Sequence, residues 1–264
     1  MSFLSPPNSS SPSFGGDRLI IASSSNPAIR KLDGYKLSVD KAGKRPILVV
    51  ANENLGPKKD PRKFIDISNL KWCAKDYDLS TDPKSYVFTE IAANNVGLPN
   101  RNMDTFPMKS TLEWRPKLGR VAFATYRWKC ANQNHQNQEP LKAKGVIFDS
   151  YMDKIKGKWH VKILVGWCRD KDGALANRIA NNKDAGYSMA CFVEEAECSV
   201  CGFKSNGGNV TCEHVRGGSG KGRLWDTGQG SPILVHEFCN KLNYWEISHV
   251  EDRADFDCSK NWVG

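Results

Sequence analysis

The sequence contains no apolar run that could span a bilayer, because its longest, PILVV at 46–50 and GVIF at 145–148, fall far short of about 20 residues. The first residues, MSFLSPPNSSSPSF, lack the basic start and the apolar centre of a secretory signal. These two absences predict a protein that works in a cytoplasm and has no membrane segment.

A nucleotide-binding loop and a dense basic run are also missing. The stretch GGSGKGRLW is rich in glycine, but the full GxxxxGKS or GxxxxGKT pattern is absent and no helix clearly follows. The formal net charge is +9, which favours acidic partners, yet the basic residues are dispersed, as in KKDPRK and GKGR. Dispersed charge indicates a solvated surface, with a dedicated nucleic-acid site as the weaker alternative.

The composition is that of an ordinary globular protein, with 264 residues of which 39% are hydrophobic and 25% charged. Residues 1–30 are rich in Ser, Pro, Asn and Gly. Such a segment cannot bury enough apolar area to offset its ordering entropy, so we expect a mobile tail there. We expect the remainder, 31–264, to form a single domain.

Nine cysteines are present, and without a secretion signal they favour thiols or metal ligands over disulfides. Four of them stand singly among apolar or aromatic neighbours, which predicts buried and inert thiols: Cys73, Cys130, Cys168 and Cys191.

Two close pairs of ligand residues predict a metal site. Cys198 and Cys201 form a CxxC pair, and Cys212 and His214 follow as CxH after a glycine-rich loop. Thiolate and imidazole ligands in two such pairs are typical of tetrahedral zinc, and four protein ligands indicate a structural site. The alternative redox function of CxxC needs a thioredoxin-like βαβ setting, which is absent.

Period-two alternation with β-branched residues predicts a mainly β fold, of class α+β. The one clear helix is 172–186, where Asp172 would cap the start, Leu175 and Ile179 would share a buried face, and Gly186 would terminate it. Segment 64–74 is ambiguous between strand and helix, and 111–118 is a short helix broken by Pro116. Strands are expected at 35–39, 46–52, 85–94, 119–129, 142–153, 158–168, 187–197, 233–242 and 243–252.

Two polar loops complete the pattern. Segment 95–107, NVGLPNRNMDTFP, has the Pro, Gly and Asn density of a loop, and Asn102 and Asp104 would bond their own backbone there. His135 lies in the second loop, ANQNHQNQEP. In the last predicted strand period-two alternation places Glu246 and Ser248 on one face. Glu246 follows Trp245, so its carboxylate is either exposed or buried with a partner.

The ordered series LPNRNMDTFP, NH with AKGVIFDSY, a helix with YSMACFVEEAECSVCG, CEH, and NYWEISHVEDRAD resembles the head maturation (prohead) proteases of tailed bacteriophages, in their zinc-knuckle branch. The resemblance covers residues 87–258. That family is related in fold to the herpesvirus assembly proteases. The resemblance therefore implies a compact antiparallel β-barrel flanked by a few helices, with a zinc-stapled insertion at about 197–216.

The resemblance also assigns roles to three residues. The family's histidine falls on His135, its serine on Ser188 and its glutamate on Glu246. A serine hydroxyl needs an adjacent base, and the base needs an acceptor on its other ring nitrogen. The herpesvirus relatives use a second histidine as the third member of the catalytic triad. His249 and His214 therefore remain alternatives to Glu246 in this role. His214 is better assigned to zinc.

The sequence departs from the family pattern in three places. Ala190 stands where the family has glycine, Arg253 stands in place of a proline, and residues 1–86 are poorly covered. Ala190 is the departure that bears on activity, because its methyl group would lie near the nucleophile.

The resemblance predicts a serine endopeptidase that cleaves capsid and scaffold proteins inside the immature phage head, in the host bacterial cytoplasm. Oligomerisation is left open. The alternative is a non-catalytic structural or DNA-associated virion protein on the same fold, because fold does not fix function.

Overall fold

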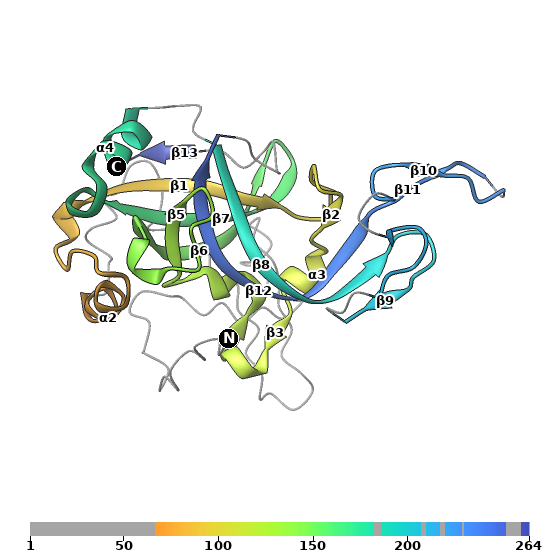
Figure 1. Cartoon of the computed structure of the whole chain (residues 1–264), viewed down its shortest axis with the longest axis horizontal. Helices are drawn as coiled ribbons and strands as arrows, with labels where there is room; N and C mark the ends of the chain where they lie inside the picture. Colours follow the sequence, from red (N-terminus) through yellow and green to blue (C-terminus); the bar gives the residue numbers. More distant parts are fainter. Residues whose placement is uncertain are drawn as a thin grey trace, which may run out of the picture.

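One curved, mixed sheet of nine described strands runs through the molecule (Figure 1). The computed structural model describes residues 67–181, 186–206, 210–216, 220–228, 230–251 and 260–263. The predicted tail at 1–30 and the predicted strands at 35–39 and 46–52 lie outside these residues. The helices and strands of the main body are α2 (Ile67–Tyr77), β1 (Tyr86–Asn95), β2 (Asp104–Thr105), α3 (Met108–Thr111), β3 (Trp114–Arg115), β4 (Arg120–Val121), β5 (Cys130–Gln133), β6 (Gly145–Ile155), β7 (Lys158–Cys168), α4 (Arg169–Asn181) and β13 (Lys260–Val263).

The remaining strands include two long ones that reach from the body into a projecting arm (Figure 1). They are β8 (Gly186–Cys198), β9 (Lys204–Ser205), β10 (Leu224–Trp225), β11 (Ile233–Leu234) and β12 (Glu237–Val250). The sheet order is β13-β1-β7-β6-β5-β12-β8-β9, and β2 pairs with β12 beside this path. The mainly β prediction is confirmed. The path is open among the described strands, so the barrel is not confirmed.

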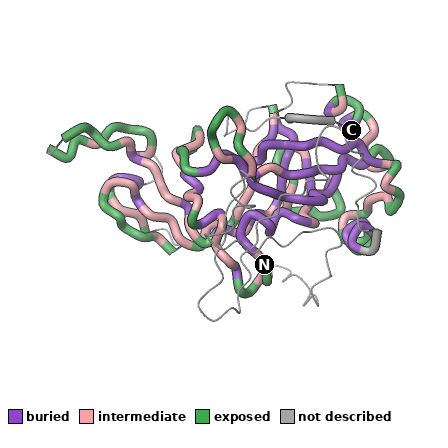
Figure 2. Tube along the Cα trace, turned by 180° about the vertical axis from the view of Figure 1, so that it is seen from behind, coloured by how far each residue is buried: buried purple, intermediate pink, exposed green. Residues whose placement is uncertain are grey.

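The core lies between the sheet and the segments that cover it. Burial of Trp167, Tyr187 and Tyr244 fills the space between β7, β8 and β12, and α4 adds Leu175 and Ile179. Figure 2 shows that buried residues concentrate in this body, whereas the arm is mostly half-buried or exposed. No helix among the described residues has the length and apolar character needed to cross a membrane.

The helix α4 confirms part of its prediction. Asp172 Oδ1 accepts a hydrogen bond from the Leu175 N–H at 2.9 Å, and Leu175 and Ile179 are buried. The predicted end was wrong, because Gly186 already belongs to β8, whereas the described part of α4 runs to Asn181. Residues 67–74 of the ambiguous segment belong to α2, and 64–66 lie outside the described residues.

The strand predicted at 119–129 was wrong. Its centre is a 3₁₀ helix, η4 (Ala122–Tyr126), whose residues are all buried against β12, so no alternation of faces is present. Thr125 Oγ1 donates to the Ala122 carbonyl and accepts the Tyr244 N–H at 2.8 Å. These bonds hold η4 against β12 without strand pairing.

The helix predicted at 111–118 was also wrong. Of this segment only Thr111 is in an α-helix, as the last residue of α3. The chain then forms β3 and a 3₁₀ turn that starts at Pro116. Proline is tolerated at the first position of such a turn because its missing N–H has no partner there in any case. The turn ends at Gly119, whose φ of +64° favours glycine.

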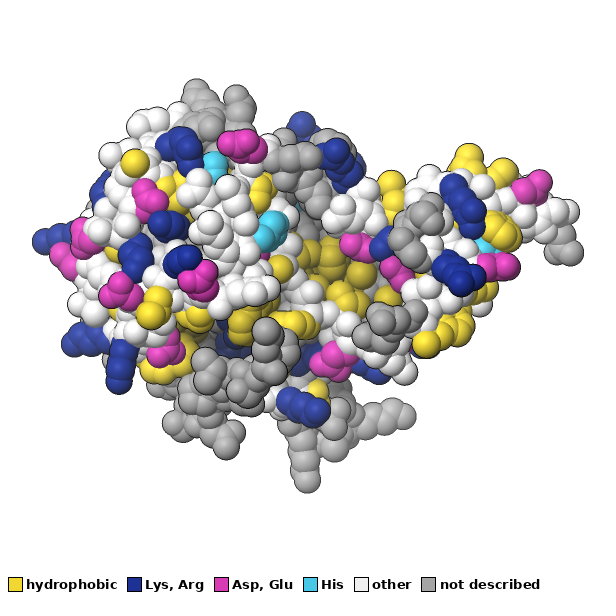
Figure 3. All heavy atoms as spheres, in the orientation of Figure 1, with side chains coloured by type: hydrophobic (Ala, Val, Ile, Leu, Met, Phe, Trp, Pro, Cys, Tyr) yellow, Lys and Arg dark blue, Asp and Glu magenta, His cyan; other side chains and the backbone are white. Residues whose placement is uncertain are grey.

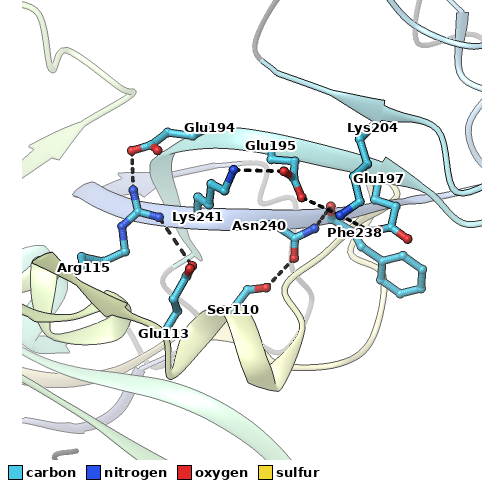
Figure 4. A network of polar contacts seen from close by, with 10 residues as sticks. All are labelled: Ser110, Glu113, Arg115, Glu194, Glu195, Glu197, Lys204, Phe238, Asn240 and Lys241. Atoms are coloured by element: carbon cyan, nitrogen blue, oxygen red, sulfur yellow. Dashed lines mark hydrogen bonds and ion pairs between the residues drawn. The ribbon is translucent and has the colours of Figure 1, made fainter. Parts of the chain in front are cut away.

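Polar contacts join the base of the arm to the segment around α3 and β3 (Figure 4). Arg115 forms ion pairs with Glu194 on β8 and with Glu113. On the arm itself Glu195 lies between Lys204 and Lys241, at 3.2 and 3.0 Å. Several of these side chains are exposed, so each pair contributes less than about 1 kcal/mol, and together they orient the arm more than they stabilise it.

Candidate functional site

A histidine and a buried carboxylate meet where β5 ends beside β12. Nδ1 of His135 lies 2.6 Å from Oε1 of Glu246. The Glu246 side chain is 0% exposed, whereas that of His135 is 42% exposed. A buried carboxylate without partners would cost several kcal/mol, so this contact accounts for the retention of an acid in an apolar strand.

Two further side chains hold the same carboxylate. Oε2 of Glu246 accepts hydrogen bonds from Ser248 Oγ at 2.7 Å and from Asn132 Nδ2 at 3.0 Å. Ser248 Oγ also accepts the backbone N–H of His135 at 3.1 Å. Sequence reasoning missed both side chains as site residues. Period-two alternation did place Ser248 on the Glu246 face, whereas Asn132 gave no signal.

The backbone of the histidine loop is bent sharply over β12. Asn134 and His135 both have positive φ, at 49° and 54°, and the Asn134 N–H donates to the His249 carbonyl at 3.1 Å. Positive φ in two successive residues other than glycine is uncommon and costs free energy. The bonds from Ser248 and Glu246 hold His135 in this conformation.

Ser188 lies across the ladder from the same group. In the antiparallel pairing of β8 with β12, Ser188 is the direct partner of Ser248, and Ala190 is the partner of Glu246. Directly opposite residues share a face, with Cβ atoms about 4.5–5.5 Å apart. Ser188 therefore stands on the face that carries His135. No hydrogen bond joins its hydroxyl to the imidazole in the described part of the chain.

Of the three candidates for third member, Glu246 is the one whose side chain bonds the His135 ring. His249 lies on the other face of β12, where its ring meets the Tyr187 ring edge-on at 5.9 Å. Burial lowers the pKa of His249, so this ring favours the neutral form. His214 belongs to the arm, in the cysteine cluster.

The Glu246 carboxylate also changes the protonation of His135. The hydrogen bond that the ring donates to Glu246 raises the pKa of the imidazole above its ordinary value of 6.5, and partial burial opposes this only in part. Because Nδ1 is engaged, Nε2 is the ring nitrogen left for proton transfer. The arrangement is a base with an oriented tautomer.

Ser188 also lines a pocket of about 330 Å³. The pocket lies along β8, between that strand, the end of β1 at Ala93 and Asn94, and the loop predicted at 95–107. Figure 3 shows apolar side chains gathered in a hollow between the body and the arm. Asn100, Asn102 and Asp104 of the loop form its polar wall.

The loop at 95–107 is held by its own side chains, as predicted. Asn100 Oδ1 accepts the N–H groups of Asn102 and Asp104 at 2.9 and 3.0 Å. The side chain that bonds the loop backbone is thus that of Asn100, and the prediction was wrong for Asp104, whose carboxylate pairs with Lys221.

The predicted metal ligands come together in the arm. Ligand atoms of Cys198, Cys201, Cys212 and His214 lie within 4.8 Å of one another. Four atoms about 2.3 Å from one zinc ion would be roughly 3.8 Å apart, so this spacing suits a single ion. The buried Nδ1 of His214 has no hydrogen-bond partner among the described residues, and a metal ion would supply one. All eight described cysteines are free thiols.

Three of the four cysteines predicted as inert thiols are buried, namely Cys73, Cys130 and Cys168. Cys191 is half-buried and lines the pocket, so the prediction was wrong about its surroundings. Burial raises the pKa of Cys191 to about 12 and that of Cys130 to about 11, so both thiols stay protonated and unreactive at neutral pH.

No protein-family model, no curated protein and no solved structure matches this chain. Function therefore has to be argued from the site itself.

Proposed function

We propose that this protein is a serine endopeptidase with Ser188 as nucleophile, His135 as base and Glu246 as the residue that orients the base. The observation that carries the proposal is the 2.6 Å contact between His135 Nδ1 and the fully buried Glu246, on the face where Ser188 stands opposite Ser248. A base fixed by a buried acid next to a half-buried serine is the arrangement that acyl transfer needs.

The chemistry follows from these positions. His135 Nε2 takes the proton of the Ser188 hydroxyl as Oγ attacks the substrate carbonyl, and it gives that proton to the departing amine. Water then repeats the attack on the acyl group, and the Ser188 Oγ leaves with the proton returned by His135. The Glu246 carboxylate would stabilise the imidazolium formed in each step. In such sites the distance between the serine Oγ and the histidine ring is often too long for a hydrogen bond until substrate binds.

The substrate would bind as an extended strand. β8 pairs with β12 on one side, whereas on its other side it pairs with β9 only at Ala196 and Glu197. Along 187–195 no described strand occupies this outer edge, so a peptide can pair there with Ser188 at hand. Alternate side chains would enter the pocket. We infer that β8 and β1 approach as two sides of a barrel and that the pocket lies in its opening.

We infer that the cysteine cluster binds one zinc ion. Three thiolates and one imidazole fill a tetrahedral shell and leave no position for water, so the ion would be structural. It would supply local folding free energy to the arm, because the arm's own core contains little beyond Cys198, Val215 and Val235.

We take the natural substrates to be capsid and scaffold proteins of a tailed phage, cut inside the immature head. The support is the order of motifs in the sequence, which resembles the prohead proteases.

The test compares wild-type protein with Ser188→Ala. Purified protein is incubated with a library of short peptides derived from cell lysate and with the capsid and scaffold proteins from the same phage genome. Cleavage is read by mass spectrometry. A fluorophosphonate probe reports the nucleophile, and Ser85→Ala is the matched control at a half-exposed serine elsewhere.

We expect cleavage and probe labelling in wild type and Ser85→Ala, and neither in Ser188→Ala. Undiminished cleavage by Ser188→Ala would overturn the assignment. A folded wild-type protein that neither cuts nor reacts with the probe would favour the structural virion protein.

A further inference from the structure

A lysine at the wall of the pocket, Lys221, follows a glycine that packs against the ligand residue His214. Nζ of Lys221 lies 2.5 Å from Oδ1 of Asp104 and 2.7 Å from Oε2 of Glu237. Its side chain is 15% exposed. Asp104 and Glu237 are partners in the parallel pairing of β2 with β12, and both line the pocket. The lysine thus binds two carboxylates that face one another at the pocket wall.

The backbone next to Lys221 is packed against a metal ligand. A Cβ atom added at Gly220 would lie 1.7 Å from the carbonyl oxygen of His214, so the chain can approach His214 this closely only with glycine. On the other side the Gly222 N–H donates to the Val235 carbonyl at 2.7 Å. The backbone on either side of Lys221 is therefore fixed, by His214 on one side and by Val235 on the other.

The loop at 97–107, which lines the pocket, depends on the contact between Lys221 and Asp104. The Asp104 carbonyl accepts the Asn100 N–H, and the Asp104 N–H donates to the Asn100 side chain, each at 3.0 Å. Asn100 and Asn102 form the polar wall with it, so a displacement of Asp104 would displace both. Without the ammonium, Asp104 and Glu237 would repel one another at close range. Burial lowers the pKa of Lys221, but its bonds to the two carboxylates raise it above the ordinary value, so it stays charged.

We propose that Lys221 is a positioning residue that transmits the order of the metal cluster to the pocket loop at 97–107, so that metal binding in the arm shapes the substrate pocket. The coupling of metal to loop order stands on these contacts alone. Its consequence for substrate affinity rests on the proposed peptidase function.

The experiment uses full-length protein and hydrogen–deuterium exchange of residues 97–107 and 198–216. The variants are Lys221→Met, which keeps the bulk without the charge, and Lys221→Arg, which keeps the charge. Lys204→Met is the matched control, because Lys204 pairs with Glu195 and Glu197 on the arm and does not line the pocket. Each protein is measured with zinc bound and after chelation.

In wild type, chelation should speed exchange in both segments. In zinc-bound Lys221→Met, exchange at 97–107 should rise about tenfold while 198–216 stays protected, and chelation should add nothing further at 97–107. Lys221→Arg and Lys204→Met should behave as wild type. Unchanged protection of 97–107 in Lys221→Met, or an equal response of that loop to chelation in both proteins, would overturn the proposal.

A kinetic measurement separates this inference from the proposed function. If the protein is a peptidase, Lys221→Met should raise KM by about tenfold and leave kcat within about threefold, because the change affects binding rather than chemistry. A protein that shows the exchange coupling but cuts no peptide retains the metal-to-loop connection and loses only the peptidase assignment. An unchanged KM in an active Lys221→Met enzyme would refute the pocket role.

Discussion

Nδ1 of His135 lies 2.6 Å from Oε1 of Glu246, and this pair joins a half-exposed loop to a carboxylate that no solvent reaches. The distance is that of a charge-assisted hydrogen bond. The pair fixes the tautomer of the imidazole, and Asn132 and Ser248 fix the carboxylate from the other side. Because burial of charged groups costs desolvation free energy, retention of this pair indicates a functional use.

Glu246→Gln should leave the fold intact and lower kcat/KM by about 10³-fold or more. The amide can still accept from Asn132 and Ser248, but its NH₂ would then face His135 and place the ring proton on Nε2, toward the serine. Steady-state kinetics and circular dichroism check this. Glu139→Gln, at an exposed glutamate in the same loop region, is the control and should be neutral. Normal turnover by Glu246→Gln together with inactive His249→Ala would assign the third role to His249.

The pH profile of kcat/KM should show an acid limb above pH 6.5, the ordinary value for histidine. The base works only when neutral, and the bond to Glu246 raises the pKa of His135, so activity rises with pH through that raised value. Glu246→Gln should move the limb toward lower pH in whatever activity remains. A limb that stays in place in this variant would show that another group titrates.

The same shift has a consequence for stability, with the opposite dependence on pH. Because folding raises the pKa of His135, the protonated ring favours the folded state. Its contribution is fully present below the unfolded value of about 6.5 and is lost as pH rises through the folded value. Activity should therefore increase across the window in which this contribution to stability declines. Urea unfolding at several pH values, with His135→Gln as reference, measures it.

Several parts of this site could be predicted from the sequence because they follow local rules. The CxxC and CxH spacing led to the metal cluster, and period-two alternation led to β8 and to Glu246 with Ser248 on one face of β12. Asn132 and Lys221 could not be found this way. Each meets its partner only through tertiary contacts, across more than a hundred residues of chain for Asn132 and Glu246. The 3₁₀ helix η4 was missed because it is buried on every side. Such a segment is largely apolar, and its pattern does not distinguish a strand from a helix.

Removal of the metal should affect the arm before the body. Native mass spectrometry of protein purified without chelators should show about one zinc ion per chain, and Cys201→Ser should lose it. Chelation should speed hydrogen exchange first at 198–216, while β6 and β7 in the body stay protected. Cys191→Ser is the control, because this thiol lies outside the cluster and should leave the metal content unchanged. Less than about half an equivalent of metal in wild type would contradict a structural zinc site.

Ala190 stands two residues from Ser188 on the same face of β8, opposite Glu246, and it tests whether a methyl group crowds the nucleophile. The residue is half-buried at the pocket and β8 runs unbroken through it, so its methyl group has room. Ala190→Gly should therefore change kcat/KM by less than about threefold. It should also lower the free energy of unfolding by about 0.5–1 kcal/mol, because glycine loses more backbone entropy in a strand than alanine does. Peptide cleavage and urea unfolding measure the two effects. A tenfold gain in kcat/KM in Ala190→Gly would show that the Ala190 methyl group does obstruct Ser188 and slows the wild-type protein.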